Sequence, residues 1–347
     1  MIGWDIGGAH VKAARIDNGQ VIDVVQCVCP LWQGLDKLDA AVADALRRLG
    51  PDTRHALTMT GEMTDLFASR ADGVAGIARH MRALLAGELK LYGGRRGWLA
   101  MDGAGDALRD WADDIASANW LATAHWVARM LPQALLVDVG STTSDLIVID
   151  RGVHTASRSD ADRLMSGELV YAGVVRTPLM ALAPRIEFRG RMHRLMAEHF
   201  ATTADVWRLL GELDERNDHY PAADNGDKTA QASARRLARM IGRDLDEGSM
   251  DDWRALAARF ADAQTGALID ACRDLPGLAA LPVDAPVVCA GAGHHVAQRL
   301  AIALGRPWLT LGDCMTSGAS SPLAGDCQDA ATTCAPAVAV ALLADIA

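Results

Sequence analysis

The stretch Val137–Asp150, VDVGSTTSDLIVID, predicts the core of the fold because it contains a strand, a tight polar loop and a second strand. Its first apolar segment ends at Asp138, and a glycine and several hydroxyl residues follow before Asp145 and the second apolar segment. Glycine lets a phosphate approach the backbone, loop N–H groups can bind that phosphate, and a neighbouring carboxylate can hold Mg²⁺. The stretch therefore predicts a hairpin that binds a phosphate and its metal.

A second copy of this pattern lies near the N-terminus, where Asp5–Lys12 reads DIGGAHVK, about half a chain earlier. A duplicated lobe, with a ligand cleft between two facing hairpins, explains the repetition economically. Lys12 would neutralise a phosphate oxygen, and the hydroxyl and N–H groups of the second loop would donate to it. The simpler alternative is that Asp and Gly only form hairpin turns.

Length and composition bound the class of protein. The chain has 347 residues, which favours two domains or one large two-lobed unit, and 50% of them are hydrophobic. The net charge of −10 argues against nucleic acid or a membrane surface as partner. The N-terminus lacks the features of a signal peptide, no apolar run approaches a membrane span, and seven cysteines without a CxxC pair indicate reduced thiols. We therefore expect a cytoplasmic protein whose partners are small molecules.

The organisation of the chain follows from its periodicity. Pro132 marks a break ahead of the second hairpin, so we expect an N-terminal lobe at 1–132 and a C-terminal lobe at 133–347. Helical spacing predicts an insertion at about 184–275, and the C-terminal segment APAVAVALLADIA reads as a buried helix. The sequence leaves the oligomeric state open, a homodimer included.

Positive charge gathers around one predicted helix. Lys228 lies just before it, and Arg235 and Arg239 are four residues apart on one face. In an acidic chain such a group is a candidate clamp for a pyrophosphate, and the alternative is an ordinary solvated face.

Four further residues could contact a ligand. Gly291 and Gly293 precede a helix whose N-terminus would favour an anion, although glycines at such turns often serve packing alone. Glu62 closes a predicted strand and Asn119 lies among small residues, and each could reach a ligand or cap a helix.

The two Asp-Gly hairpins and the later glycine turn resemble those of the actin, sugar-kinase and Hsp70 superfamily. Within it, DVGSTTSDLIVI is similar to the hydantoinase A/oxoprolinase family, whose second loop reads DxGGTTxD, with Ser141 here in place of the second glycine. The segments TMTGEMTDLFASRADGV, ASANWLATA and RSDADRLMSGELVYAGVVRTP resemble one subfamily, linked to tetrahydromethanopterin-dependent one-carbon transfer. The resemblance implies an α/β, two-lobed, ribonuclease H-like fold with duplicated domains and a helical insertion.

The same resemblance implies a reaction. Characterised members of that subfamily join the furan and phenol halves of methanofuran, so a synthase is expected that condenses an aminomethylfuran-methanol diphosphate with a phenol oxygen. The acceptor would be gamma-glutamyltyramine, or tyrosine in a methylofuran pathway; pyrophosphate would leave, an aryl ether would form, and Mg²⁺ would be the cofactor. An ATP-dependent kinase or ATPase of the same fold, and a nucleotide-binding scaffold protein, remain alternatives because fold alone does not decide function.

The predicted site is therefore as follows. Asp5 and Asp138 are the expected metal ligands, and Asp5, Lys12, Asp138 and Asp145 the expected catalytic residues, with Asp145 or Glu62 as the base that takes the phenol proton. The expected phosphate-binding residues are Gly7, Gly8, Gly140, Ser141, Thr142, Thr143, Gly291 and Gly293. The expected substrate-binding residues are Glu62, Asn119, Lys228, Arg235 and Arg239.

Overall fold

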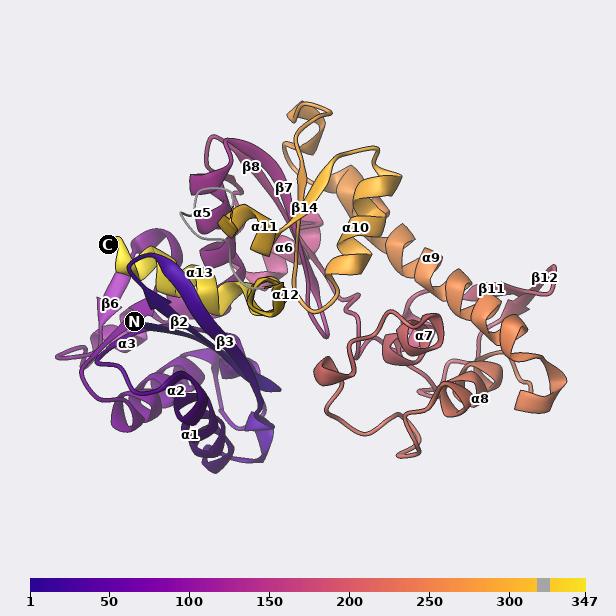
Figure 1. Ribbon diagram of the computed structural model, residues 1–347, viewed down its shortest axis with the longest axis horizontal. Coiled ribbons are helices and arrows are strands. Elements are labelled where there is room, and N and C mark those ends of the chain that lie inside the picture. Colours follow the sequence, from indigo (N-terminus) through magenta and orange to yellow (C-terminus); the bar gives the residue numbers. More distant parts are fainter. Residues whose placement is uncertain (317–324) are drawn as a thin grey trace. The chain divides into compact units, whose positions relative to one another are not determined.

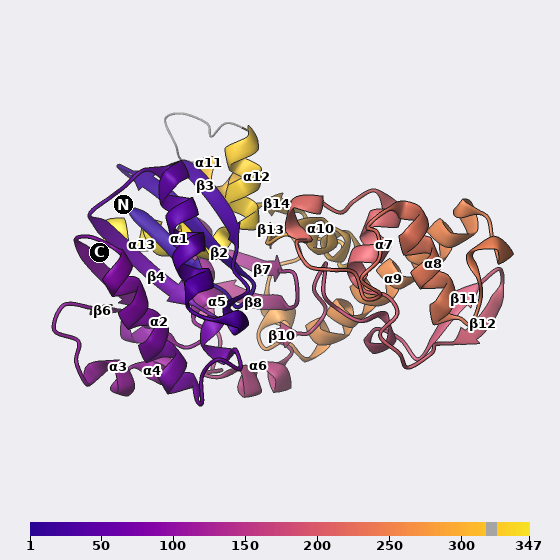
Figure 2. The same ribbon diagram turned by 90° about the horizontal axis from the view of Figure 1, so that it is seen from below.

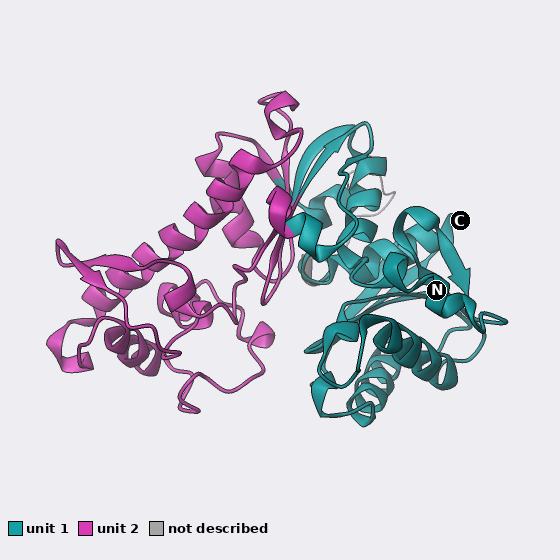
Figure 3. Cartoon of the chain, turned by 180° about the vertical axis from the view of Figure 1, so that it is seen from behind, with its two compact units in different colours: residues 1–136, 147–163, 309–347 teal, residues 137–146, 164–308 magenta. Residues whose placement is uncertain are grey.

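The computed structural model describes residues 1–316 and 325–347 (Figure 1). The chain forms two compact units (Figure 3). Unit 1 contains residues 1–136, 147–163 and 309–347, and unit 2 contains residues 137–146 and 164–308.

The first sheet lies in unit 1 and has the strand order β3-β2-β1-β4-β5-β6. The first three strands form an antiparallel meander, and β4 and β5 then join in parallel, as crossover connections require. The β2–β3 turn is Asn18-Gly19, with φ of 49° and 74°, which is the pairing that a tight hairpin favours. The strands are β1 Ile2–Ile6, β2 His10–Asp17, β3 Gln20–Val28, β4 Arg54–Met59, β5 Glu88–Tyr92 and β6 Trp98–Ala100.

Helices cover both faces of this sheet (Figure 2). Ile2, Trp4 and Ile6 alternate along β1 and pack with apolar residues of α1 (Asp36–Leu49) and α2 (Arg70–Leu84). Gly3 faces the opposite side, where a Cβ atom would lie 2.2 Å from the Ala337 carbonyl oxygen of α13 (Ala335–Asp345). The missing side chain therefore lets the C-terminal helix lie directly on the sheet.

The predicted buried C-terminal helix is thus confirmed, since the residues Ala335–Ala344 of α13 are all buried. Because α13 packs on β1, β2 and β4, residues 309–347 belong to the compact unit of the N-terminal sheet. The compact units therefore follow a different division from the predicted lobes 1–132 and 133–347, and those lobes stay a prediction. The other helices of this unit are α3 Ala107–Asp110, α4 Ala112–Ile115, α5 Asn119–Met130, α6 Asp160–Ser166 (which continues into unit 2), α11 Leu311–Thr316 and α12 Gly325–Thr333.

The second sheet repeats the first. Its order is β10-β8-β7-β13-β14, which matches β3-β2-β1-β4-β5 strand for strand, and β9 pairs with β8 outside this path. The predicted duplication, and with it the predicted α/β fold class, are confirmed. The strands are β7 Gln133–Val139, β8 Ser144–Asp150, β9 Val153–His154, β10 Leu169–Val170, β13 Val287–Ala290 and β14 Trp308–Thr310.

The predicted insertion lies between β10 and β13 and is mainly helical, with α7 Thr203–Leu210, α8 Ala230–Met240 and α9 Met250–Asp274, after which α10 His294–Ala303 follows β13. It also contains a hairpin of β11 Arg185–Phe188 and β12 Arg191–Arg194, which the helical spacing did not indicate. Arg236 of α8 is fully buried there, and its guanidinium donates to Asp205 at 2.7 Å and Asp224 at 3.0 Å. A buried ion pair therefore joins α7, α8 and the preceding loop.

No single helix in the described ranges is long and apolar enough to cross a membrane. One bent pair, Cys327–Thr333 with Ala335–Asp345 at 97°, meets the length and composition criteria together.

Candidate functional site

The first Asp-Gly loop and the Glu62 turn lie side by side in unit 1. Strands β1 and β4 run in parallel, so the loop after Ile6 and the turn Gly61–Met63 leave the sheet at the same edge. The Thr60 N–H donates to the Ile6 carbonyl at 2.9 Å, and a Cβ atom at Gly61 would lie 3.3 Å from the Gly7 carbonyl oxygen. The predicted residues Gly7 and Glu62 are therefore brought together, as ligands bind at the carboxyl ends of parallel strands.

Asp5 is buried, with 4% of its surface exposed, and it stands in register with Lys12 on β2 and Thr58 on β4. Residues directly opposite on neighbouring strands project from the same face of the sheet. Asp5 and Lys12 thus place one carboxylate and one ammonium group together, a set that can meet a metal-bound phosphate with an oxygen ligand and a cation.

Glu62 is 1% exposed because helix α2 lies directly against it: a Cβ atom at Gly73 would lie 2.5 Å from the Glu62 carbonyl oxygen. Its Oε1 accepts a hydrogen bond from the Ser117 hydroxyl at 2.8 Å, and its Oε2 has no hydrogen-bond partner in the described part of the chain. Burial raises the pKa of Glu62 to about 7, against a smaller lowering by the Ser117 hydrogen bond. A carboxyl with this pKa can accept and release a proton near neutral pH.

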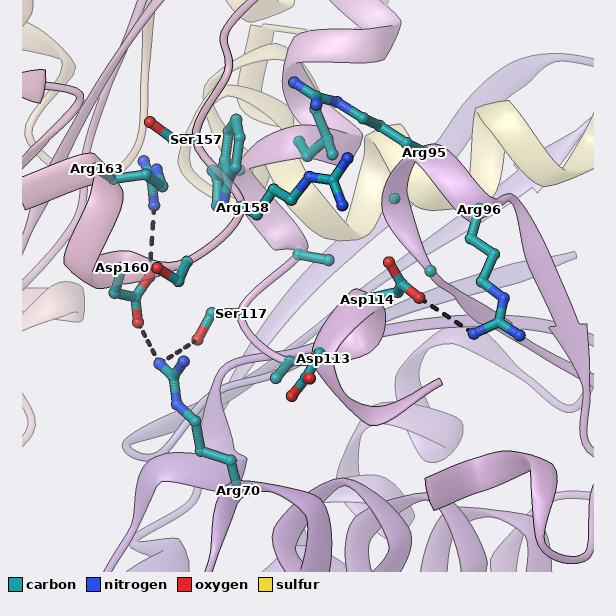
Figure 4. A pocket seen from close by; sticks show the side chains of 17 residues that line it. Arg70, Arg95, Arg96, Asp113, Asp114, Ser117, Ser157, Arg158, Asp160 and Arg163 are labelled. Atoms are coloured by element: carbon teal, nitrogen blue, oxygen red, sulfur yellow. Dashed lines mark hydrogen bonds and ion pairs between the residues drawn. The ribbon is translucent and has the colours of Figure 1, made fainter. Parts of the chain in front are cut away.

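A pocket of about 650 Å³ opens on the Ser117 side of this pair and lies wholly within unit 1 (Figure 4). Segments 93–96, 113–121 and 157–163 line it, together with Arg70 of α2. We call it the arginine pocket, because five arginines and three aspartates are among its lining residues: Arg70, Arg95, Arg96, Arg158, Arg163, Asp113, Asp114 and Asp160.

Some of these charges are engaged with one another. Arg70 donates to Asp160 and, at 3.5 Å, to the Ser117 hydroxyl. Arg163 lies 3.8 Å from Asp160, and its guanidinium stacks 4.1 Å above the centre of the Trp120 ring. These contacts hold the segment that begins near residue 157 against α2 and α5.

Arg96 on the other wall is also neutralised. It pairs with Asp110 at 2.6 Å and with Asp114 at 3.3 Å. Within the described part of the chain, Arg95 donates only to a backbone carbonyl, that of Thr155. Among residues 1–316 and 325–347, neither Arg158 nor the Asp113 carboxylate has a side-chain hydrogen bond or ion pair, and both are exposed.

The second Asp-Gly loop lies in unit 2, and its carbonyl groups accept hydrogen bonds from the segment 173–176. Ser141 accepts hydrogen bonds from the N–H groups of Val175 and Arg176 at 3.0 and 2.8 Å, and Thr142 accepts one from Gly173 at 3.0 Å. Within the described ranges the N–H groups of Ser141, Thr142 and Thr143 donate no hydrogen bond. Consecutive N–H groups of this kind form the sort of concavity that binds phosphate.

Asp138 and the glycine turn meet beside this loop. A Cβ atom at Gly291, where φ is +83°, would lie 2.3 Å from the Asp138 Oδ1, and the Gly293 N–H donates to the Val139 carbonyl at 2.7 Å. These glycines are needed for close packing against the end of β7, and Gly140 closes the loop by donating to Thr143 at 2.8 Å. The turn therefore brings Gly291 next to Asp138, the predicted metal ligand.

The residues of the predicted clamp on α8 have different surroundings, and the clamp stays a prediction. Lys228 is held by Asp218, at 3.1 Å from its carboxylate and 2.6 Å from its carbonyl oxygen. Arg235 and Arg239 line a separate pocket of about 510 Å³ in unit 2, and Arg239 lies 3.6 Å from Asp224. Lys228 therefore has a structural partner, whereas the two arginines remain open to a ligand.

Of the remaining predicted residues, Asn119 and Gly8 lie in unit 1 and Asp145 lies in unit 2. Asn119 is the first residue of α5, after the N-cap residue Ala118, and its neighbours Ala118 and Trp120 line the arginine pocket. Gly8 lies at the tip of the first loop, where a Cβ atom would meet Thr64 at 3.0 Å. Asp145 is half-buried on β8, in register with Leu169.

The sequence reasoning missed the residues that form the arginine pocket. Ser117, Arg158, Asp160 and Arg163 belong to segments that carry the family resemblance, but no motif indicated that they meet. The dense alternation of charge and hydroxyl groups in SRSDADR, residues 157–163, was the one available signal. Exposed Arg176, whose N–H donates to Ser141 of the second loop, was missed as well.

The described residues contain no group of three or more His, Cys, Asp or Glu side chains that could hold a metal ion. Mg²⁺ is compatible with this because it is commonly held by one or two carboxylates together with substrate phosphates and water. Burial raises the pKa of the Cys27 and Cys29 thiols to about 12 and about 11, which makes them poor thiolate ligands.

Comparison with known proteins gives the family first. The hydantoinase/oxoprolinase family matches residues 53–309, more than half of the chain, and the chain belongs to this family. The (4-{4-[2-(gamma-L-glutamylamino)ethyl]phenoxymethyl}furan-2-yl)methanamine synthase of Methanocaldococcus jannaschii is 32% identical over 248 residues, which cover 71% of this chain and 72% of that protein. The synthase of the same name from Methanococcus vannielii is 34% identical over 126 residues, or 36% of this chain and 57% of that protein. Both relatives are named as synthases, that is, as enzymes.

Solved structures similar to this chain include component A of the (R)-2-hydroxyglutaryl-CoA dehydratase of Acidaminococcus fermentans, with a TM-score of 0.44, 10% identity and 98% of both chains covered. The nucleotide-free acetone carboxylase has a TM-score of 0.48 at 10% identity, over 88% of this chain and 67% of that chain.

Proposed function

We propose that this protein is a transferase of methanofuran or methylofuran biosynthesis, which condenses an aminomethylfuran-methanol diphosphate with the phenol oxygen of tyrosine or gamma-glutamyltyramine. The observation that carries the proposal is the 32% identity to a synthase whose name describes a phenoxymethylfuran, over 71% of this chain. The ether in that name is the bond that such a condensation would form.

The chemistry asks for two things. The bond between the furfuryl carbon and the diphosphate must break, which the electron-rich furan assists, and the negative charge of the leaving group must be stabilised in a place that excludes water. For the second task we propose the N–H groups of Ser141–Thr143 with Arg176 as a cationic contact, all within unit 2; in unit 1, Lys12 stays a proposed phosphate contact beside Asp5. Support comes from the open N–H groups of the loop and from the exposed position of Arg176.

Mg²⁺ is part of this proposal. Asp5 in unit 1 and Asp138 in unit 2 are each a buried carboxylate beside a glycine loop, with 4% and 8% of their surfaces exposed, and each suits a cation that takes most of its ligands from phosphate and water. When bound, the ion would neutralise charge on the leaving diphosphate.

The phenol must also lose its proton as the new C–O bond forms. We propose Glu62 as the acceptor, acting through Ser117: the phenol proton passes to the Ser117 oxygen while the Ser117 proton passes to Glu62. Support comes from the 2.8 Å hydrogen bond between them and from the raised pKa of Glu62, which lies nearer to that of a phenol than an ordinary carboxyl does.

A direct assay tests the proposal. Purified protein is incubated with Mg²⁺, the furan diphosphate and either tyrosine or gamma-glutamyltyramine, and the aryl ether and pyrophosphate are quantified by mass spectrometry and a coupled assay. Ether formation without ATP is expected, and it should be abolished by Asp138→Asn in a protein whose circular dichroism is unchanged. ATP hydrolysis stimulated by an acceptor, without ether, would instead support the kinase alternative.

A further inference from the structure

We propose that the arginine pocket binds the amino-acid end of the acceptor, that is, its α-carboxylate and α-ammonium groups, and so selects which phenol reacts. The inference rests on the proposed function for the identity of the acceptor. Both candidate acceptors share this end: tyrosine carries it directly, and the gamma-glutamyl group in the name of the relatives' product carries it as well.

The charge of the pocket fits a zwitterion. Five arginines against three aspartates leave two positive charges, and Asp110, which pairs with Arg96 from outside the lining, compensates one of them. One net positive charge suits a ligand that presents a single carboxylate to the arginines, and it is too little for the several negative charges of a diphosphate.

The individual charges also match the two ends of an amino acid. The Arg158 guanidinium has no partner in the described ranges, and Figure 4 shows it reaching into the pocket. Arg95 donates to a backbone carbonyl and pairs with no carboxylate of the described residues, so these two arginines can bind a carboxylate, for which the guanidinium fork is well suited. The Asp113 carboxylate, exposed and without an ion pair in the same ranges, can bind an ammonium group.

The rest of the lining suits a phenol. Trp120 and Leu121 of α5 add apolar surface, and Gly93 and Gly94 also line the pocket. Ser117 lies on the lining and is hydrogen-bonded to Glu62, so a phenol oxygen at Ser117 would meet the proposed proton acceptor. A volume of about 650 Å³ is within the usual range of roughly 300–1,000 Å³ for small-molecule sites.

Binding measurements without the furan diphosphate test this inference separately from the reaction. Isothermal titration calorimetry would compare gamma-glutamyltyramine, tyrosine, tyramine (which lacks the carboxylate) and inorganic pyrophosphate on the wild-type protein and two variants. We expect gamma-glutamyltyramine or tyrosine to bind at least roughly tenfold more tightly than tyramine, since tyramine has no carboxylate to accept charge-assisted hydrogen bonds from Arg158. Arg158→Ala should remove this preference, and Asp113→Asn should weaken the carboxylated acceptors and tyramine alike, because all three carry an ammonium group.

The matched controls are Arg79→Ala and Asp106→Asn, two exposed residues of unit 1 outside the arginine pocket, and both should leave the affinities unchanged. The inference is overturned if wild-type protein binds neither carboxylated acceptor, if Arg158→Ala binds them as wild type does, or if that variant loses pyrophosphate alone. Ether synthesis that persists unchanged in Arg158→Ala would leave the proposed function standing and remove the pocket from it. Arg158-dependent binding of a carboxylated acceptor without ether synthesis would support the pocket as an acceptor site and contradict the proposed function.

Discussion

Helix α8 and the arginine pocket show two fates of clustered arginines. On α8 the arginines are neighbours in the sequence, yet Arg236 is fully buried in an ion pair with Asp205 and serves the packing of the insertion. In the arginine pocket the charges come from four separate parts of the sequence, and Arg158 is left exposed at an open cavity. Proximity in sequence therefore did not separate buried Arg236 from exposed Arg235 and Arg239, whereas the cavity was assembled only by the fold.

The largest effect that sharpens this comparison is expected at Glu62, beside the pocket. Glu62→Gln removes the proton acceptor but keeps the shape, so kcat should fall by roughly 10²–10⁴-fold, the usual contribution of a general base. Stopped assays of ether formation would measure it, with Asp145→Asn as the comparison. A greater loss in the Asp145 variant would show that the proton goes there instead.

The next largest effect is expected on the free energy of unfolding, which should differ between an arginine variant of α8 and one of the arginine pocket. Arg236→Ala would remove the nearer of the two arginines that pair with buried Asp205 and leave only Arg208, at 3.6 Å, so the free energy of unfolding should fall by about 3–5 kcal/mol. Arg158→Ala should change it by less than about 0.5 kcal/mol, since an exposed side chain without partners is lost. Urea denaturation followed by circular dichroism measures both, and similar values for the two variants would contradict the distinction.

A smaller effect concerns pH. The pKa of Glu62 rises from 4.5 to about 7 on folding, so the folded state binds more protons between these values and stability falls as pH rises through that window. At pH 8 the wild type should be less stable than Glu62→Gln by about 3 kcal/mol, and below pH 4.5 the two should converge. Denaturation at several pH values tests this, and a pH-independent difference would show that Glu62 is not a buried titrating group.

The smallest effect is expected on α8. The proposed function places the leaving diphosphate at the Ser141–Thr143 loop. The double variant Arg235→Ala and Arg239→Ala should therefore leave the KM for the furan diphosphate unchanged within about twofold, and the free energy of unfolding unchanged within about 0.5 kcal/mol. Steady-state kinetics of the double variant would decide. A large rise in KM would support the predicted pyrophosphate clamp and place the diphosphate at the pocket of about 510 Å³ in unit 2.

The sequence was most informative where the signal is local. The hairpins at Asp5 and Asp138 follow from apolar alternation broken by glycine, and their repetition predicted the duplicated sheets that the two strand orders confirm. The hairpin at Arg185–Arg194 was missed because it is short and lies in a helical context. Glu62 was recognised as a candidate by its place after a strand, but nothing local indicated its burial.

By itself the sequence determined the strand and loop pattern, the family and the residues available for chemistry, because these depend on spacing along the chain. Only the tertiary structure decided that Arg70, Ser117 and Asp160 meet, that Arg236 is buried, and that the pKa of Glu62 rises. The physical reason is that burial and charge compensation depend on what packs around a side chain. Around Arg70 and Ser117, for example, the contacts come from helix α2 and segment 157–163, which lie far apart in sequence.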